Sequence, residues 1–183
     1  MPAEGVSASV AVIARAINSG IVLRGATFAD RPFPRGPAGG ARDKSTTDAA
    51  TWRGGGFSDT AVTRAFFVPG KKFRAPQFLA TSFNRRVATG FMEQATMSGP
   101  VNARTLWKIR LDRGCGCEHV TLVTNTHVRG ELEYLFTAFS VFTVEVVNWS
   151  ANPTKKATPH EITIVAAVDN RVEPEDLPLA PRC

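Results

Sequence analysis

The sequence predicts an α+β domain of two packed, mostly antiparallel β-sheets with short flanking helices. Three observations lead to this fold class. Apolar residues at helical spacing are confined to two short segments before residue 95. Alternating apolar and polar residues dominate the second half of the chain. Helix and strand patterns do not follow one another in regular alternation, which argues against a parallel sheet built from βαβ units.

The first elements are a helix, a short strand and a long loop. Residues 6–17 repeat apolar side chains at helical spacing and predict an amphipathic helix that Gly20 ends. The apolar segment 21–27, IVLRGAT, predicts a brief strand ending at Arg24. Proline and glycine then concentrate from residue 30 to 56, so we expect a long loop there, with one helical turn at 46–52.

A strand and a helix follow the loop. PQFLATSF, residues 76–83, is apolar, ends in two hydroxyl residues and predicts a strand. NRRVATGFMEQ, residues 84–94, predicts a helix with Asn84 as N-cap and with Val87 and Phe91 as its buried stripe.

The second half of the chain predicts strands. TLWKIRL, residues 105–111, alternates regularly and should bury Trp107, Ile109 and Leu111. Similar patterns predict four more strands, at 119–123, 131–136, 140–147 and 161–168. We expect one domain over residues 1–170 and a proline-rich tail over 171–183.

Composition narrows the function classes. A chain of 183 residues with 43% hydrophobic residues can bury a core. Its net charge of +6 is compatible with binding to a nucleic acid, an anionic membrane or a dinucleotide, and equally with a solvated basic surface that binds no partner. No apolar run approaches the ~18 residues of a membrane-spanning helix. Arg15 interrupts the apolar N-terminus, so no signal peptide is expected. The compartment of this soluble domain stays open between the cytoplasm and delivery as an effector or toxin domain. Cys115, Cys117 and Cys183 match no zinc-site spacing, so no metal is expected.

Two glutamates stand on one side of the predicted strand ELEYLF, residues 131–136. Side chains alternate along a strand, so Glu131 and Glu133 share one face, ~7 Å apart, while Leu132, Tyr134 and Phe136 share the other. A half-solvated acidic face is the ordinary interpretation of such a pattern. The alternative is a pair of functional carboxylates, in which mutual repulsion raises one pKa.

Three segments in order carry a resemblance. LRGA at 23–26, FLATSFNRRVATGFM at 78–92 and ELEYLFTAFSVFTVEVV at 131–147 resemble the Arg, Ser-Thr-Ser and Glu-x-Glu blocks of the mono-ADP-ribosyltransferases of the Arg–Ser–Glu group. That group includes cholera-like and clostridial toxins and arginine-specific vertebrate enzymes. The resemblance covers residues 6–168 apart from the 30–56 loop, and it implies the ADP-ribosyltransferase core fold.

The resemblance also implies roles for individual residues. Glu133 matches the catalytic glutamate that bonds the nicotinamide ribose of NAD, and Glu131 matches the residue that orients or activates an acceptor arginine. NAD-binding residues are expected at the other matching positions, Arg24, Gly25, Thr81, Ser82 and Arg85. The implied partners are NAD and a protein acceptor with an arginine. Nucleic acid is disfavoured, because base-modifying members carry Gln where Glu131 stands.

Two departures from the family pattern leave alternatives open. Ala80 replaces the first serine of Ser-Thr-Ser, although Ser82 shares its strand face and is a candidate substitute. The segment before Glu131 lacks the aromatic residue that many members use to hold the acceptor, and His127 is a candidate for that role. The alternatives to a transferase are an NAD glycohydrolase, in which water is the acceptor, and a non-catalytic binding module on the same fold.

Overall fold

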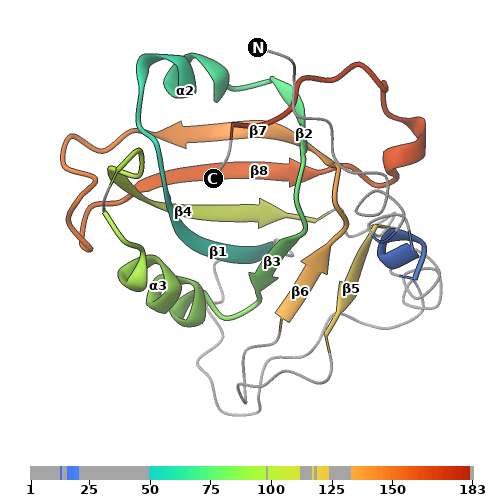
Figure 1. Ribbon diagram of the computed structural model, residues 1–183, viewed down its shortest axis with the longest axis horizontal. Coiled ribbons are helices and arrows are strands. Elements are labelled where there is room, and N and C mark those ends of the chain that lie inside the picture. The colour runs from blue at the N-terminus through green and yellow to red at the C-terminus, as the bar shows by residue number, and fades with distance from the viewer. Residues whose placement is uncertain are drawn as a thin grey trace.

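The computed structural model describes residues 13, 16–20, 50–97, 99–111, 117, 119–123 and 133–181. Within this part of the chain, strands form one mixed sheet in the order β2-β7-β8-β4-β1-β3-β6-β5 (Figure 1). Every pairing is antiparallel except the parallel pairing of β4 with β8. The predicted α+β fold class is therefore confirmed.

The strands are β1 (Ala50–Phe57), β2 (Lys72–Ala75), β3 (Leu79–Ser82), β4 (Ala103–Arg110), β5 (Val120–Leu122), β6 (Glu133–Phe136), β7 (Ser140–Asn148) and β8 (His160–Ala166). The helices are α2 (Ala61–Phe66), α3 (Arg85–Gln94) and a 3-10 turn, Asn170–Val172. Residues 16–20 are also helical; they overlap the end of the helix predicted over 6–17 and reach Gly20, the predicted stop.

The sheet bends between β1 and β3. These two strands share a single register pair, Trp52 with Ser82, whereas β1 pairs with β4 along its whole length. The ribbon shows β3, β6 and β5 turning away from the layer formed by β7, β8, β4 and β1 (Figure 1). The two expected sheets are thus two halves of one curled sheet that meet at this pair.

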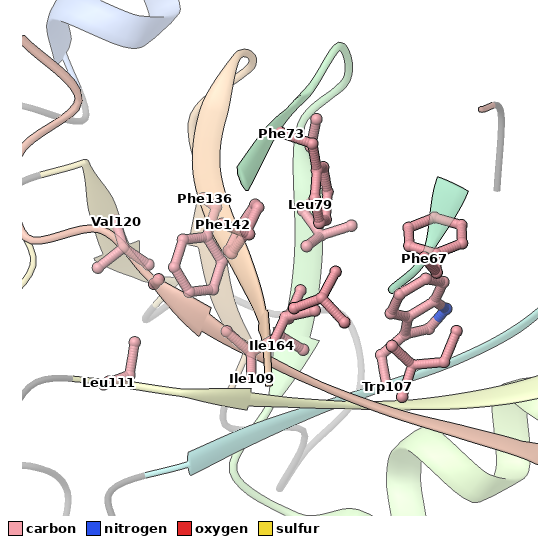
Figure 2. Packing of buried hydrophobic residues seen from close by; sticks show 14 of the residues in the cluster. Phe67, Phe73, Leu79, Trp107, Ile109, Leu111, Val120, Phe136, Phe142 and Ile164 are labelled. Carbon is pink, nitrogen blue, oxygen red and sulfur yellow. The ribbon is translucent and has the colours of Figure 1, made fainter. Parts of the chain in front are cut away.

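An aromatic-rich core lies on the inner side of the curl. Figure 2 shows Phe67 and Trp107 together at one end of the core and Phe136 and Phe142 at the other. Edge-to-face contacts join both pairs, with ring centroids 5.1 Å and 5.3 Å apart. Trp107, Ile109 and Leu111 are all buried, as the alternating pattern of this strand predicts.

Residues 50–56 overturn the predicted loop, because they form most of strand β1 at the centre of the sheet. The glycines of WRGGG led to the wrong expectation. A Cβ atom on Gly54 would overlap the backbone carbonyl oxygen of Ala88 and lie 2.7 Å from the Met92 nitrogen. Glycine therefore lets helix α3 pack directly on the backbone of β1.

Helix α3 begins where predicted but buries a different face. The Asn84 side chain accepts a hydrogen bond from the Arg86 N–H, which confirms the N-cap. Ala88 and Met92 are the buried residues of the helix, whereas Val87 is half-buried and Phe91 is 53% exposed. The predicted stripe is wrong because α3 lies close on a glycine of β1, so the small Ala88 occupies the contact.

The chain end covers an edge of the sheet. Arg74 on the edge strand β2 accepts a hydrogen bond from the Ala180 N–H at 2.8 Å and donates its own N–H to Pro178 at 2.9 Å. Leu179 forms a parallel bridge with Arg74. Pairing of this kind satisfies backbone groups that an open edge strand would expose. Helix α2 and strand β2 were not predicted from the sequence.

Candidate active site

A cleft of about 440 Å³ lies between helix α3 and strands β1, β3 and β6. Clefts of this size, with apolar walls and a few polar groups, are typical of small-molecule sites. The lining residues are Trp52, Arg53, Gly54, Gly55, Ala80, Thr81, Ser82, Val87, Ala88, Phe91, Gln94, Ala95 and Glu133. Both sequence-predicted hydroxyl residues and one of the two predicted carboxylates are thus brought together.

Three of these residues form a row across neighbouring strands. Ser82 on β3 is the register partner of Glu133 on β6 and also of Trp52 on β1. Directly opposed residues in antiparallel strands place their side chains on the same face of the sheet. Trp52, Ser82 and Glu133 therefore occupy one face, and all three line the cleft.

This row bears on the missing serine at position 80. Ala80 shares the face of Ser82, since the two are two residues apart, but its register partner is Leu135. A serine thus stands directly opposite Glu133 although position 80 has none. The Ser82 side chain is buried, and its Oγ accepts the Asn84 N–H at 2.9 Å, which orients the hydroxyl at the start of α3.

Thr81 contributes differently from Ser82. Its Oγ1 donates a hydrogen bond of 2.7 Å to the Tyr134 carbonyl oxygen on β6, and the side chain is buried. The bond joins β3 to β6 one residue away from the Ser82–Glu133 pair. Thr81 therefore holds the register of the strands that carry the pair.

Arg53 is a cleft residue that the sequence prediction missed. It lies on β1 next to Trp52, and its Nη1 donates a hydrogen bond of 3.1 Å to the Ala80 carbonyl oxygen on β3. The bond anchors a guanidinium group at the cleft. The available signal was the segment WRGGG, in which an arginine between an aromatic residue and three glycines sits on a backbone that other groups can approach closely.

Gly55 provides one such approach. It lines the cleft, and a Cβ atom built on it would meet no atom within 4 Å. At the neighbouring Gly54, by contrast, the backbone of α3 fills the space that a Cβ atom would need. The cleft therefore has open space directly over the main chain of β1.

Arg85 lies beside the cleft rather than in its lining. Its guanidinium carbon lies 5.0 Å from the centre of the Trp52 ring, and its Nη2 lies 3.2 Å from a carboxylate oxygen of Glu161. The other predicted site residues, Arg24, Gly25, Glu131 and His127, lie outside the described residues.

The cleft combines three chemical capacities. A fixed carboxylate such as Glu133 can accept a hydrogen bond from a ligand hydroxyl and stabilise positive charge that develops beside it. A guanidinium such as Arg53 can bind a phosphate through its planar fork. Val87 and Phe91 supply an apolar wall for a planar ring.

Among the described residues, no cluster of three His, Cys, Asp or Glu side chains could hold a metal ion. No described helix is long and apolar enough to cross a membrane.

Solved structures with the same fold are ADP-ribosyltransferases. The ADP-ribosyltransferase Vis of Vibrio splendidus, in complex with the M6 inhibitor, matches with a TM-score of 0.53 and 17% identity, over 69% of this chain and 52% of that chain. Vis in complex with agmatine matches with a TM-score of 0.51 and 16% identity over the same shares. Exoenzyme S from Pseudomonas aeruginosa, in complex with human 14-3-3 protein beta and bound to carba-NAD, matches with a TM-score of 0.52 and 12% identity, over 94% of this chain and 67% of that chain.

Structural matches at such low sequence identity establish the fold alone. The chain has the ADP-ribosyltransferase fold of the bacterial toxins. It spans about half the length of Vis. No family model and no curated protein matches the sequence.

Proposed function

We propose that this protein is a mono-ADP-ribosyltransferase that cleaves NAD and transfers ADP-ribose to the arginine side chain of an acceptor protein. The observation that carries the proposal is the row of Trp52, Ser82 and Glu133 in one cleft, with Arg53 beside it. Arginine, serine and glutamate thus stand on the adjacent strands β1, β3 and β6 of an ADP-ribosyltransferase fold.

The chemistry of NAD cleavage suits a carboxylate in this position. The bond between the ribose C1′ and the nicotinamide nitrogen breaks through an oxocarbenium-like state, in which hydrogen bonds to the 2′-hydroxyl strengthen. Glu133 would accept that hydrogen bond and stabilise the developing positive charge. Nicotinamide leaves as a neutral molecule, so its departure requires no proton.

Transfer to arginine then forms a bond between C1′ and a guanidinium nitrogen, which loses one proton. Glu131, predicted from the Glu-x-Glu pattern, is our candidate for the group that accepts this proton or orients the acceptor. Agmatine in Vis and carba-NAD in Exoenzyme S support a guanidine acceptor and an NAD donor on this fold.

We assign the dinucleotide to the cleft along α3. Arg53 would bind a phosphate or ribose oxygen, and Thr81 and Ser82 would hold the Glu133 strand in place. Arg24 and Gly25 remain predicted NAD contacts on the sequence pattern, and Arg85 remains a predicted contact at the rim.

The test is transfer of label from NAD to an arginine-rich acceptor, with release of nicotinamide measured in parallel. Glu133→Gln keeps the size of the side chain and removes its charge, so we expect both rates to fall by about 10²–10³. An unchanged melting temperature would show that the variant is folded. Label transfer that proceeds equally well in Glu133→Gln would contradict the proposal, and free ADP-ribose without acceptor labelling would identify an NAD glycohydrolase.

A further inference from the structure

We propose that the acceptor docks through acidic residues flanking its target arginine, on a basic patch formed by Arg85, Arg86 and Lys108 beside the cleft. This inference rests on the proposed function and adds the chemistry of its protein partner. The patch is defined by these three residues throughout.

The basic patch adjoins the cleft through Trp52. Lys108 on β4 is the register partner of Trp52, so it shares the sheet face that carries Ser82 and Glu133. The Lys108 Nζ lies 5.8 Å from the centre of the Trp52 ring, and the Arg85 guanidinium lies 5.0 Å from it. Two cations therefore contact one aromatic ring that itself lines the cleft.

The positive charge of the patch is only partly balanced. Arg85 pairs with Glu161 at 3.2 Å, and both side chains are about half exposed. In the part of the chain that the structure describes, neither Arg86 nor Lys108 contacts an acidic side chain. Arg86 is exposed and Lys108 is half-buried, so a ligand in solution can reach both charges.

Helix stability does not explain this placement. Arg85 and Arg86 are the first residues of α3, and the first turn contains no acidic residue. The N-terminus of a helix carries a partial positive charge, so cations there are unfavourable and anions are favoured. The Asn84 cap stabilises the helix without any help from the arginines. Arg85 already pairs with Glu161, so a bound acidic group would pair mainly with Arg86 and with the helix end.

The patch has a consequence for the choice of acceptor. A basic acceptor segment that lies over Trp52 while its arginine enters the cleft would be repelled by the patch. Acidic neighbours on the acceptor would reverse this repulsion by pairing with the patch while the arginine enters the cleft. The charge pattern therefore selects arginines in acidic surroundings and discriminates against basic segments.

The experiment compares peptides that contain one arginine flanked by glutamates, by alanines or by lysines. Fluorescence anisotropy measures their binding to the full chain without any chemistry, and labelled NAD measures transfer. We expect the glutamate-flanked peptide to bind most tightly, with an affinity that falls as salt is raised. Arg86→Glu combined with Lys108→Glu should weaken its binding at least about threefold. Lys155→Glu combined with Lys156→Glu, an equal charge change at two exposed loop positions, is the matched control.

Failure of this inference is distinguishable from failure of the proposed function. Absence of NAD cleavage would contradict the proposed function, while the anisotropy comparison would still test the patch. Equal binding of the three peptides, or an equal loss of binding in the Lys155→Glu, Lys156→Glu control, would overturn the patch. Tighter binding of single-stranded DNA than of the acidic peptide would overturn it too. If the double variant raised the KM for NAD in hydrolysis as much as the KM for the peptide, the patch would belong to the dinucleotide.

Discussion

Ser82 and Glu133 lie directly opposite each other on β3 and β6, and the Ser82 Oγ accepts the Asn84 N–H at 2.9 Å. The helix start, the serine and the glutamate are thereby fixed relative to one another. Position 80, where the resemblance leads one to expect a serine, lies opposite Leu135 instead. We therefore propose that Ser82, rather than a residue at position 80, supports Glu133.

Exchange of the hydroxyl between positions 80 and 82 tests this assignment. We expect Ser82→Ala to lower the kcat of NAD cleavage by about ten- to a hundredfold, because Glu133 loses a neighbouring hydrogen-bonding group. The same change leaves the Asn84 N–H without its acceptor, which costs about 1–3 kcal/mol of stability. Ala80→Ser serves as the partner variant and, because position 80 lies opposite Leu135, should neither raise kcat nor restore the activity of Ser82→Ala. Steady-state kinetics of the two single variants and the double variant decide the matter, and an inert Ser82→Ala would assign the support of Glu133 to another group.

Arg53→Lys tests the guanidinium of the cleft. Lysine keeps the charge but loses the planar fork and the hydrogen bond to Ala80, so we expect the KM for NAD to rise about tenfold with a smaller effect on kcat. Isothermal calorimetry with NAD measures the same loss as affinity. Arg171→Lys, an exposed arginine on the 3-10 turn, is the control and should bind NAD as the unchanged protein does.

Sequence patterns predicted the regular parts of this fold well. The alternation around Trp107 and the apolar face with Tyr134 and Phe136 were correctly assigned to the core, because burial of alternate residues is a local property of a strand. The Asn84 cap could be predicted because it too is local: its side chain bonds to a backbone group only two residues further along the chain. Strand β1 was missed because its glycines serve a contact with α3 that no local pattern records.

The candidate site was predicted only in part, because residue type is visible in the sequence whereas the register between strands is not. Ser82 and Glu133 stood out through the type and order of their residues, and the register then placed them together. The sequence does not single out Arg53, because the glycines that follow it predict a loop where the structure has strand β1. Long-range register, rather than residue type, brings the strand of Arg53 beside the strand of Ser82.

Two adjacent glycines on β1 should respond to alanine in opposite ways. Gly54→Ala places a methyl group into the α3 backbone at Ala88, so we expect a loss of about 1–3 kcal/mol or more in the free energy of unfolding. Gly55→Ala meets no atom and should leave that free energy within about 0.5 kcal/mol, while it narrows the cleft and weakens NAD binding. Urea unfolding and NAD calorimetry measure the two effects. Equal destabilisation by both substitutions would contradict the packing of α3 on β1.

His160 is buried and makes hydrogen bonds that require a neutral ring. The Ser150 N–H donates to Nδ1 at 2.9 Å, and Nε2 lies 3.1 Å from the Asp59 carboxylate, to which it donates. A doubly protonated ring has no lone pair for the Ser150 N–H. Burial lowers the pKa of His160, and the attraction of Asp59 only partly offsets this effect. Burial lowers the pKa of His119 as well.

Stability should therefore fall in mild acid. Below the ordinary histidine pKa of about 6.5 the unfolded chain takes up a proton that folded His160 refuses, so the free energy of unfolding decreases as pH falls from there toward the lowered pKa of the folded state. The stabilisation is fully present above about pH 6.5. His160→Gln should be less stable at neutral pH by about 1–3 kcal/mol, since Ser150 loses its acceptor, but its stability should depend less on pH in this window. Denaturant unfolding at a series of pH values measures both curves. The difference between the two proteins should be constant above neutral pH and shrink in acid, whereas parallel curves throughout would show that His160 does not titrate on unfolding.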